Sequence, residues 1–244
     1  MAYVKHAMKD KDALFKGSQA KEYALFNRAV PHHDDFQRTV GRLVNSSIIR
    51  PAAAKGKKAT LAEGGIGTGC TLSMVLDETG MLAGVERLYA VDVSPAMVDI
   101  CRRDFAIPQI EFVTADLLSF FGGSAPTLDG AYSAYTIHNL PQVDQVPIFK
   151  AIYAKLKPGG CFVDGDLLAY QDPELQRSVF QWQQDMVRKN LPPELAEQWI
   201  DHYNQDALRY FTAEQLLSVL SGIGFTARVE YREKLEAVIL ARKP

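Results

Sequence analysis

The sequence predicts an α/β fold: a seven-stranded, mostly parallel sheet that ends in an antiparallel C-terminal hairpin. Two observations lead to this prediction. From Thr60 to Asp166, short apolar runs alternate with helix-forming stretches, which is typical of a parallel sheet with helices on both faces. Near the end of the chain, two apolar segments, 225–231 and 235–241, have the pattern of a closing hairpin.

Five strands are expected before the hairpin, and helix signals lie between them. The expected strands are 59–62, 88–91, 110–113, 131–135 and 161–166. Ser94 and Pro95 suit the cap and the first turn of a helix after the second strand. The helix predicted over 146–156 ends at Lys157-Pro-Gly-Gly160, because proline and glycine stop a helix there.

Residues 1–50 are expected to form an N-terminal helical cap that precedes the first strand. Phe36, Val40 and Val44 recur at helical spacing in this segment. Pro51 and the Ala/Lys/Gly-rich residues after it are interpreted as a linker into the core domain.

A second helical segment interrupts the alternation after Tyr170. Asp172-Pro173 starts a predicted helix with an apolar stripe, and a second helix follows it. The stripe is Leu175, Val179, Trp182 and Met186, and the second helix carries Leu195, Trp199 and Tyr203. We expect this segment to be an insertion over the carboxyl edge of the sheet. The predicted domains are the cap 1–50, the core 51–170 with 211–244, and the insertion 171–210.

The composition is that of an ordinary globular protein and argues against several function classes. The chain has 244 residues, 47% of them hydrophobic and 23% charged, with a net charge of −2. This balance provides no basic field for nucleic acid, and no run approaches the ~20 apolar residues of a membrane span. Three widely spaced cysteines form no metal-binding pattern, so no metal is predicted, and their sparse number suits a cytoplasmic protein.

The most informative stretch is the loop between the first strand and its helix, Glu63-Gly-Gly-Ile-Gly-Thr-Gly-Cys70. Glycines let a backbone adopt positive φ and approach a ligand, so the loop predicts a nucleotide-binding unit. A dinucleotide fingerprint would have glycine at Cys70, and a carboxylate at Glu63 would repel a pyrophosphate. The expected ligand is therefore cationic. A tight turn without a ligand is the alternative.

This loop resembles motif I of the class I S-adenosylmethionine-dependent methyltransferases, [D/E]-x-G-x-G-x-G. Val91–Met97, Thr114–Leu117 and Asp129–Pro141 are similar to that family's second-, third- and fourth-strand motifs. The resemblance covers about residues 58–168. It implies a Rossmann-like fold, S-adenosyl-L-methionine as cofactor and S-adenosyl-L-homocysteine as product. This cofactor carries an ammonium and a sulfonium but no phosphate, in agreement with the expected cationic ligand.

The resemblance also implies a set of cofactor-binding residues at the carboxyl ends of the strands. Asp92 would accept both ribose hydroxyls, Asp116 would accept from the adenine amino group, and the Leu117 amide would face the ring. The alternatives are that Asp92 only caps a turn and that Asp116 is an ordinary loop acid. The full set is Glu63, Gly65, Gly67, Gly69, Asp92, Val93, Met97, Asp116, Leu117 and Tyr135.

Two histidines are candidates for a general base, which the reaction needs only if the nucleophile arrives protonated. His138 follows the fourth strand, where the fold places catalytic side chains; a residue that starts a helix is the alternative. His33 lies in the predicted cap beside Asp34, which would raise the pKa of His33. The alternative is that His33 belongs to a solvated turn after Pro31. Asp166 ends the fifth strand. It is expected either to be a solvated or helix-capping acid or to contact the substrate.

Aromatic residues of the added segments are expected either to contact the substrate or to pack in the core. The candidates for substrate contact are Tyr170, Trp182, Trp199 and Tyr203. A pocket closed by a cap and an insertion suits a small molecule and excludes a polymer.

The resulting prediction is in-line methyl transfer to an oxygen, nitrogen or carbon atom of a small molecule, with a homodimer left open. One alternative is methylation of RNA or DNA, although base-amino methyltransferases carry [DNS]-P-P-[YF] where this chain has Thr136-Ile-His-Asn-Leu-Pro141. A second is a non-catalytic S-adenosylmethionine-binding protein. A third is modification of the cofactor itself, as in carboxy-S-adenosylmethionine synthases, for which the sequence identifies no substrate-binding arginine.

Overall fold

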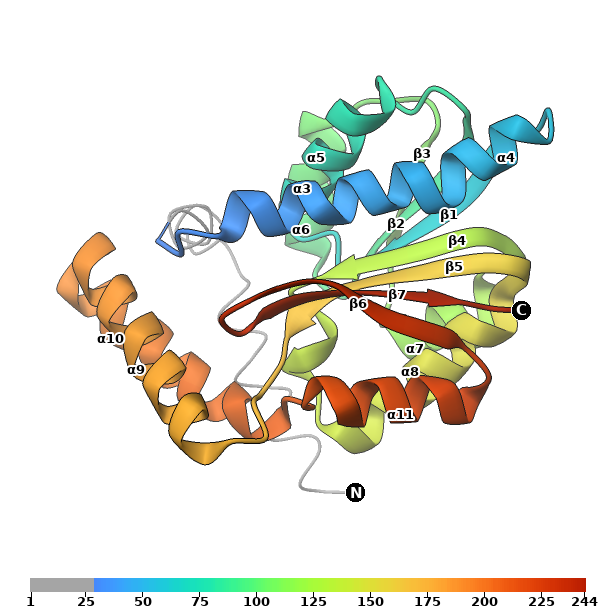
Figure 1. Cartoon of the computed structure of the whole chain (residues 1–244). Coiled ribbons are helices and arrows are strands. Elements are labelled where there is room, and N and C mark those ends of the chain that lie inside the picture. Colours follow the sequence, from blue (N-terminus) through green and yellow to red (C-terminus); the bar gives the residue numbers. More distant parts are fainter. Residues whose placement is uncertain (1–28) are drawn as a thin grey trace.

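The chain folds around one seven-stranded sheet, seen in the computed structural model, which describes residues 29–244 (Figure 1). The strands are β1 (Ala59–Gly64), β2 (Val85–Asp92), β3 (Ile110–Thr114), β4 (Leu128–Ala134), β5 (Leu156–Leu167), β6 (Thr226–Glu233) and β7 (Glu236–Arg242). Their order in the sheet is β3-β2-β1-β4-β5-β7-β6. The first five strands pair in parallel, whereas β7 is antiparallel to β5 and β6. The predicted fold is confirmed; predictions for 1–28 lie outside the described residues.

Helices cover both faces of the sheet, as Figure 1 shows. One face carries α3 (His33–Val44), α5 (Cys70–Thr79) and α6 (Pro95–Asp104), and the other carries α7 (Leu117–Ser119), α8 (Gln142–Lys155) and α11 (Ala213–Ile223). Short helical segments complete the layers: η1 (Asn45–Ile49), α4 (Arg50–Ala54), η2 (Phe120–Ser124), η3 (Ile137–Asn139) and η4 (Ala207–Arg209). The carboxyl ends of the parallel strands therefore meet at one edge between two helical layers.

The described part of the N-terminal segment is a layer of the core as well as a neighbour of the site. Phe36, Val40 and Val44 on α3 are fully buried. Phe36 and Val40 pack over Gly165 of β5, where a Cβ atom would stand 2.8 Å from each side chain. The expected linker at Pro51 is wrong, because this proline lies in the first turn of α4, where the missing N–H is tolerated.

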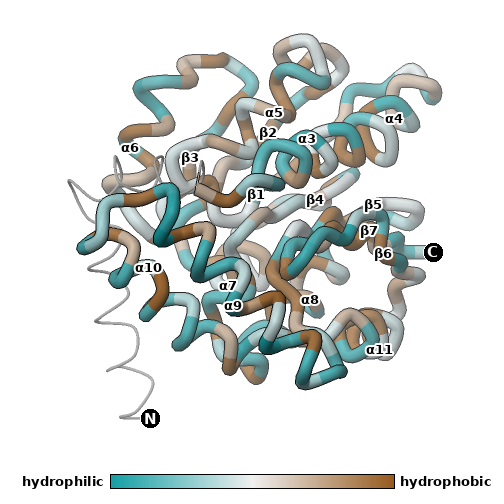
Figure 2. The backbone as a smooth tube through the Cα atoms, turned by 60° about the vertical axis from the view of Figure 1, so that its left-hand side comes forward, coloured by the Kyte–Doolittle hydropathy of each residue, from teal (hydrophilic) through white to brown (hydrophobic). Residues whose placement is uncertain are grey.

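Residues 171–210 contain the two predicted helices, α9 (Pro173–Asn190) and α10 (Pro193–Asp206). The predicted apolar stripe of α9 is wrong in part. Val179 is buried, but Leu175 is exposed, and the buried face continues through Gln183 and Val187. Figure 2 shows hydrophilic and hydrophobic residues alternating along both helices, because each one has a covered and an open side.

The insertion packs against the carboxyl edge of the sheet. Its apolar side chains form one cluster with Leu167 at the end of β5 and Leu235 in the turn between β6 and β7. The members from 171–210 are Val179, Val187, Leu191, Ala196, Trp199, Ile200, Tyr203 and Tyr210. The region where β4 and β5 end is thereby covered by side chains from a segment outside the sheet.

Alanine at Gly165 should destabilise the protein, because its Cβ atom would crowd Phe36 and Val40 in a closely packed layer. The expected loss in the free energy of unfolding, measured by urea denaturation, is about 1–3 kcal/mol. Gly222→Ala in α11 is the matched control: a Cβ atom there meets nothing within 4 Å, and alanine favours a helix by up to ~1 kcal/mol. An equal loss in both variants would contradict the packing of α3 on β5.

Candidate functional site

The glycine loop between β1 and α5 is shaped by three left-handed backbone positions. Gly65, Gly67 and Gly69 have φ angles of 76°, 52° and 85°, which other residues rarely adopt. At Gly65 a Cβ atom would overlap the side chain of Thr136, so the loop lies tightly against the residues that follow β4. At Gly67 a Cβ atom would meet nothing within 4 Å. The loop therefore presents an open backbone at Gly67 and a packed one at Gly65.

Asp92 joins this loop to the turn after β2. Its Oδ2 accepts a hydrogen bond from the Gly67 amide at 2.9 Å, and its Oδ1 accepts one from the Ser94 amide at 2.9 Å. Burial raises the pKa of Asp92, and the backbone hydrogen bonds only partly offset this effect. A carboxylate offers about four lone-pair sites. Asp92 therefore caps the turn and still has acceptor capacity for the hydroxyl groups of a ligand.

Exposed apolar side chains stand beside the acids at the ends of β2 and β3. Asp116 caps α7 by accepting a hydrogen bond from the Ser119 amide at 2.8 Å. Burial alone would raise the pKa of Asp116, but hydrogen bonds from Ser119 and from the backbone of Asp116 and Leu118 together outweigh burial and lower it. Val93 is 55% exposed and Leu118, which the sequence did not single out, is 46% exposed. Apolar groups left open beside carboxylates suit a flat ring that carries polar substituents.

The Glu63 carboxyl lies in the core and not at the mouth of the loop. It is 1% exposed and accepts a hydrogen bond from the Tyr132 hydroxyl at 2.8 Å. Burial raises the pKa of Glu63 to about 8; the Tyr132 hydrogen bond opposes the rise and the charge of Asp92 adds to it. Near neutral pH the carboxyl is mostly protonated, so the argument that its charge repels a phosphate is wrong. Met97 and Leu117 are also buried, and their side chains contribute to packing.

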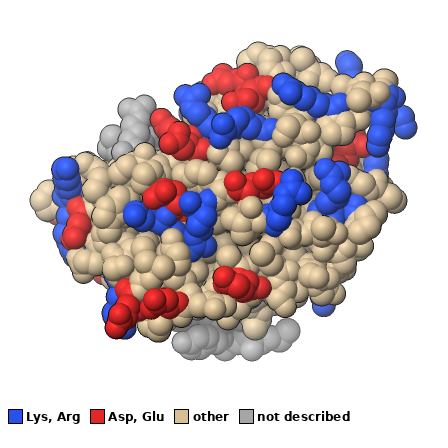
Figure 3. Space-filling model, viewed as in Figure 1, with Lys and Arg blue, Asp and Glu red and all other residues tan. Residues whose placement is uncertain are grey.

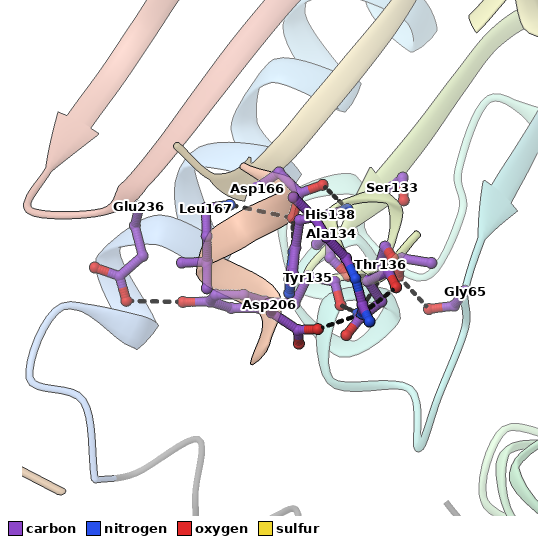
Figure 4. A network of polar contacts seen from close by, with 12 residues as sticks. Gly65, Ser133, Ala134, Tyr135, Thr136, His138, Asp166, Leu167, Asp206 and Glu236 are labelled. Atoms are coloured by element: carbon purple, nitrogen blue, oxygen red, sulfur yellow. Dashed lines mark hydrogen bonds and ion pairs between the residues drawn. The ribbon is translucent and has the colours of Figure 1, made fainter. Parts of the chain in front are cut away.

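His138 and Asp166 meet at the carboxyl ends of β4 and β5 (Figure 4). His138 lies in η3, and both residues are buried. Asp166 accepts a hydrogen bond from the ring Nδ1 of His138 through Oδ1 and from the His138 amide through Oδ2, the latter at 2.8 Å. Because the carboxylate binds Nδ1, the ring hydrogen belongs there and Nε2 carries the lone pair. This arrangement orients a histidine as a proton acceptor.

A second polar group lies on the α3 side of the same edge. His33 stacks on Tyr135, with ring planes 1° apart and centroids 5.7 Å apart. Tyr135 has a φ of 50°, unusual for a bulky residue, and its hydroxyl donates to Glu236 at 2.9 Å (Figure 4). Burial raises the pKa of Glu236 to about 7. Burial lowers the pKa of His33 although Asp34 acts in the opposite direction, so the expected rise is wrong.

The four residues predicted to contact a substrate divide into two pairs. Trp199 and Tyr203 of α10 are buried in the cluster between the insertion and the sheet. Tyr170 and Trp182 are half-buried and adjoin the turn of the β6–β7 hairpin instead. The Tyr170 hydroxyl donates to the Lys234 carbonyl at 2.7 Å, and the Lys234 ammonium lies 5.2 Å from the centroid of the Trp182 ring. Trp199 and Tyr203 are thus members of this cluster, whereas Tyr170 packs against it from the side of the hairpin turn.

Reasoning from sequence missed the partners of the predicted residues. Glu63 meets Tyr132, His138 meets Asp166 and Tyr135 meets Glu236, at separations of 69, 28 and 101 positions along the chain. No local pattern connects residues so far apart. Only Asp166 gave a signal, because it ends a strand next to the one that His138 follows.

Within residues 29–244, no group of three or more His, Cys, Asp or Glu side chains is placed to hold a metal ion. None of the helices in that range is long and apolar enough to cross a membrane. On the face shown in Figure 3, acidic and basic side chains are interspersed.

Comparison with known protein families agrees with the geometry of the glycine loop and the strand ends. Residues 62–160 match a family model described as a methyltransferase domain. The central region of this chain is therefore similar to methyltransferase domains. The match begins inside β1 and ends inside β5. It therefore includes His138 and excludes Asp166.

Curated proteins that are similar to this chain include carboxy-S-adenosyl-L-methionine synthases. The chain is 27% identical over 154 residues to that of Campylobacter fetus subsp. fetus and 25% identical over 172 residues to that of Photorhabdus laumondii subsp. laumondii. These matches cover 62% and 68% of this chain. They span only 59% and 63% of the length of the two relatives.

Solved structures with the same fold include other methyltransferases. Human N-acetylserotonin methyltransferase in complex with S-adenosylmethionine superposes with a TM-score of 0.61 at 16% identity, covering 95% of this chain and 58% of that one. The DszA carbon methyltransferase superposes with a TM-score of 0.66 at 19% identity, covering 95% and 59%. At these identities the likeness concerns the fold.

Replacing Glu63 with glutamine should make the stability of the protein less dependent on pH. The unfolded carboxyl loses its proton near its usual pKa of 4.5, whereas the folded one keeps it until about 8. Wild-type stability therefore falls as the pH rises through this window, by up to ~1.4 kcal/mol per pH unit for one proton. Denaturation between pH 5 and 8 should show a shallower slope in Glu63→Gln.

The exposed Glu86 provides the matched control, since Glu86→Gln should leave the slope unchanged. Part of the slope should persist in both variants, because the pKa of Glu236 is raised in the same direction. A wild-type slope in Glu63→Gln would contradict the buried, protonated state of this carboxyl.

Proposed function

We propose that this protein transfers the methyl group of S-adenosyl-L-methionine to a small-molecule acceptor, with His138 as general base. The observation that carries the proposal is the buried His138–Asp166 pair beside the left-handed glycine loop. A methyl donor on one side and an oriented base on the other are what methylation of a protonated nucleophile requires.

The edge formed by β1, β2 and β3 suits the nucleoside part of the cofactor. The open backbone at Gly67 allows close approach, and Asp92 retains acceptor sites for two ribose hydroxyls. The exposed Val93 and Leu118 offer an apolar surface for the adenine ring. When bound, S-adenosylmethionine supplies an electrophilic methyl group on a sulfonium.

The residues around β4 and β5 provide the remaining chemistry. His138 accepts the acceptor's proton at Nε2, and Asp166 holds the ring in place and stabilises the imidazolium that results. Both side chains are buried, so little water competes for the proton or screens their interaction. Since a thioether is a neutral leaving group, no acid is needed to assist its departure.

A second candidate function is carboxylation of the cofactor, which the names of the curated relatives suggest. Such a reaction needs a cation to hold a carboxylate-bearing donor. Two arginines lie near the relevant edge of the described structure, and both are engaged. Arg209 donates to Asp206 at 2.6 Å and to the Asn139 carbonyl, and Arg232 donates to the Leu168 carbonyl and stacks on a tyrosine. This favours methyl transfer.

Incubation with S-adenosylmethionine labelled in its methyl group and a metabolite extract separates these functions. Methyl transfer yields labelled acceptor and S-adenosylhomocysteine. Carboxylation yields a heavier cofactor and no S-adenosylhomocysteine, and a binding protein yields neither product. Labelled RNA would support the nucleic-acid alternative. The cytoplasmic location and a homodimer stay predictions.

Asp92→Ala should weaken S-adenosylmethionine binding by roughly 1.5–3 kcal/mol, the usual contribution of hydrogen bonds to a charged group. Titration calorimetry measures the change. Asp99→Ala, at an exposed position on the neighbouring helix α6, is the control and should bind normally. Unchanged affinity in the Asp92 variant would remove this carboxylate from the cofactor site.

His138→Gln should reduce turnover about 10²- to 10⁴-fold while leaving cofactor affinity nearly intact, because general-base catalysis is lost and binding is not. Asp166→Asn should also reduce turnover, and the double variant should be little worse than His138→Gln, since the two residues act as a unit. S-adenosylhomocysteine formation with an acceptor from the extract is the readout. Additive losses in the double variant would contradict the pairing.

A further inference from the structure

A buried tyrosine hydroxyl beside His138 lacks a hydrogen-bond partner. Tyr210 is 5% exposed and its hydroxyl oxygen is closed to solvent, yet it meets no donor or acceptor in the part of the chain that is described. Buried polar atoms in folded proteins are nearly always hydrogen-bonded, so an exception needs an explanation. A ligand that completes the hydrogen bond is one such explanation.

The position of Tyr210 is fixed by contacts to the turn that carries His138. Its ring packs edge-to-face against the His138 ring, with centroids 5.5 Å apart and planes at 88°. Gln142 on α8 donates to the Tyr210 carbonyl at 3.0 Å, and Gln145 donates to the Arg209 carbonyl at 3.2 Å. These backbone contacts hold the phenol beside the base.

The hydroxyl of Tyr210 is protonated and can therefore donate a hydrogen bond. Burial raises the pKa of Tyr210 well above its usual value, and the charges of Tyr203, Asp206 and Asp166 raise it further, against a smaller opposite effect of Arg209. The phenol therefore keeps its proton at neutral pH. A neutral donor next to an oriented base is a specific combination, since one group gives a hydrogen bond where the other accepts a proton.

We propose that Tyr210 contacts the acceptor substrate and that the acceptor atom is a hydroxyl oxygen; the inference rests on the proposed methyl transfer. The oxygen releases its proton to Nε2 of His138 while one of its lone pairs accepts a hydrogen bond from Tyr210. Another lone pair forms the bond to the methyl carbon as the carbon–sulfur bond breaks and its electrons stay on sulfur.

The same pair of groups disfavours the other acceptor atoms. A neutral amine has a single lone pair, which the methyl group must take, so a hydrogen bond from Tyr210 would block it. A carbon nucleophile accepts no hydrogen bond at the reacting atom. Of these three atoms, only oxygen has enough lone pairs to satisfy a donor, a methyl group and a base together. The Tyr210 hydroxyl thus favours oxygen as the acceptor atom.

Two small aromatic probes, 4-nitrophenol and 4-nitroaniline, test the assignment by binding alone. They share the ring and the nitro group and differ in hydroxyl against amine. Titration calorimetry on protein saturated with S-adenosylhomocysteine, at a pH that keeps both probes neutral, should show at least tenfold tighter binding of 4-nitrophenol. Tyr210→Phe should lose about tenfold in 4-nitrophenol affinity. It should leave 4-nitroaniline unchanged, because the amine lone pair of that probe is delocalised into the nitro-substituted ring and accepts hydrogen bonds poorly.

Tyr153→Phe on α8 is the matched control, because Tyr153 packs on Phe225 and should not affect either probe. Tyr210→Phe should melt at the wild-type temperature, since its hydroxyl has no partner to lose. A melting temperature lowered by several degrees would assign the hydroxyl a structural bond and overturn the proposal.

The remaining outcomes separate the two proposals. If S-adenosylhomocysteine does not bind, the proposed function fails. If it binds but the wild type shows no preference for 4-nitrophenol, or Tyr210→Phe keeps that preference, the proposed function stands and the role of Tyr210 is refuted. A Tyr210→Phe variant that keeps the preference is also expected if a buried water, and not a ligand, is the hydrogen-bond partner of the Tyr210 hydroxyl.

Discussion

The geometry of the site depends on one carboxylate, that of Asp166. It accepts hydrogen bonds from the His138 ring, from the His138 amide and from the Leu167 amide. A carboxylate with three N–H donors has a fixed orientation, and it fixes the turn after β4 together with the ring. The same turn carries Thr136, which lies against Gly65 of the glycine loop. The base and the loop are therefore placed by one set of contacts.

Other carboxyl groups are also buried, and they differ in the hydrogen-bond donors around them. Glu63 has one hydroxyl donor and a pKa of about 8. Asp164, two residues before Asp166 on the same face of β5, has a buried oxygen without a partner in the described structure. Burial and the charge of Asp166 raise the pKa of Asp164 well above its usual value. An isolated buried carboxylate is far costlier than a neutral carboxyl, so Asp164 favours its neutral form. Asp166, in contrast, has three N–H donors around it and lies next to His138.

Local patterns were sufficient for the fold and insufficient for the site. Strand and helix periodicity, with proline and glycine as boundaries, act over a few residues, and they predicted the parallel strands and the hairpin. The errors arose where tertiary packing decides. Pro51 suits a first helical turn as well as a linker, and only the helix before it distinguishes the two.

Predictions of charge and burial from the sequence failed for the same reason, namely that tertiary packing decides them. The spacing of α9 could not reveal that Gln183 is covered while Leu175 is open, because the choice depends on α10 and the sheet edge. For His33, the nearby Asp34 was visible in sequence, but the opposing and larger effect of burial was not. Pairs such as His138 with Asp166 depend on strand order, which local sequence does not encode.

Sequence similarity to known families covers only one part of the site. The family match ends at residue 160, so it contains the glycine loop, Asp92 and His138 but none of the insertion. The proposed acceptor side adds residues beyond that point, namely Asp166, the α10 aromatics and Tyr210. The Ala169 amide ties this segment to the sheet by donating to the Phe211 carbonyl at 2.9 Å. In the proposed reaction, His138 from the matched part and Tyr210 from the part beyond it together select the acceptor atom, and their rings pack against each other.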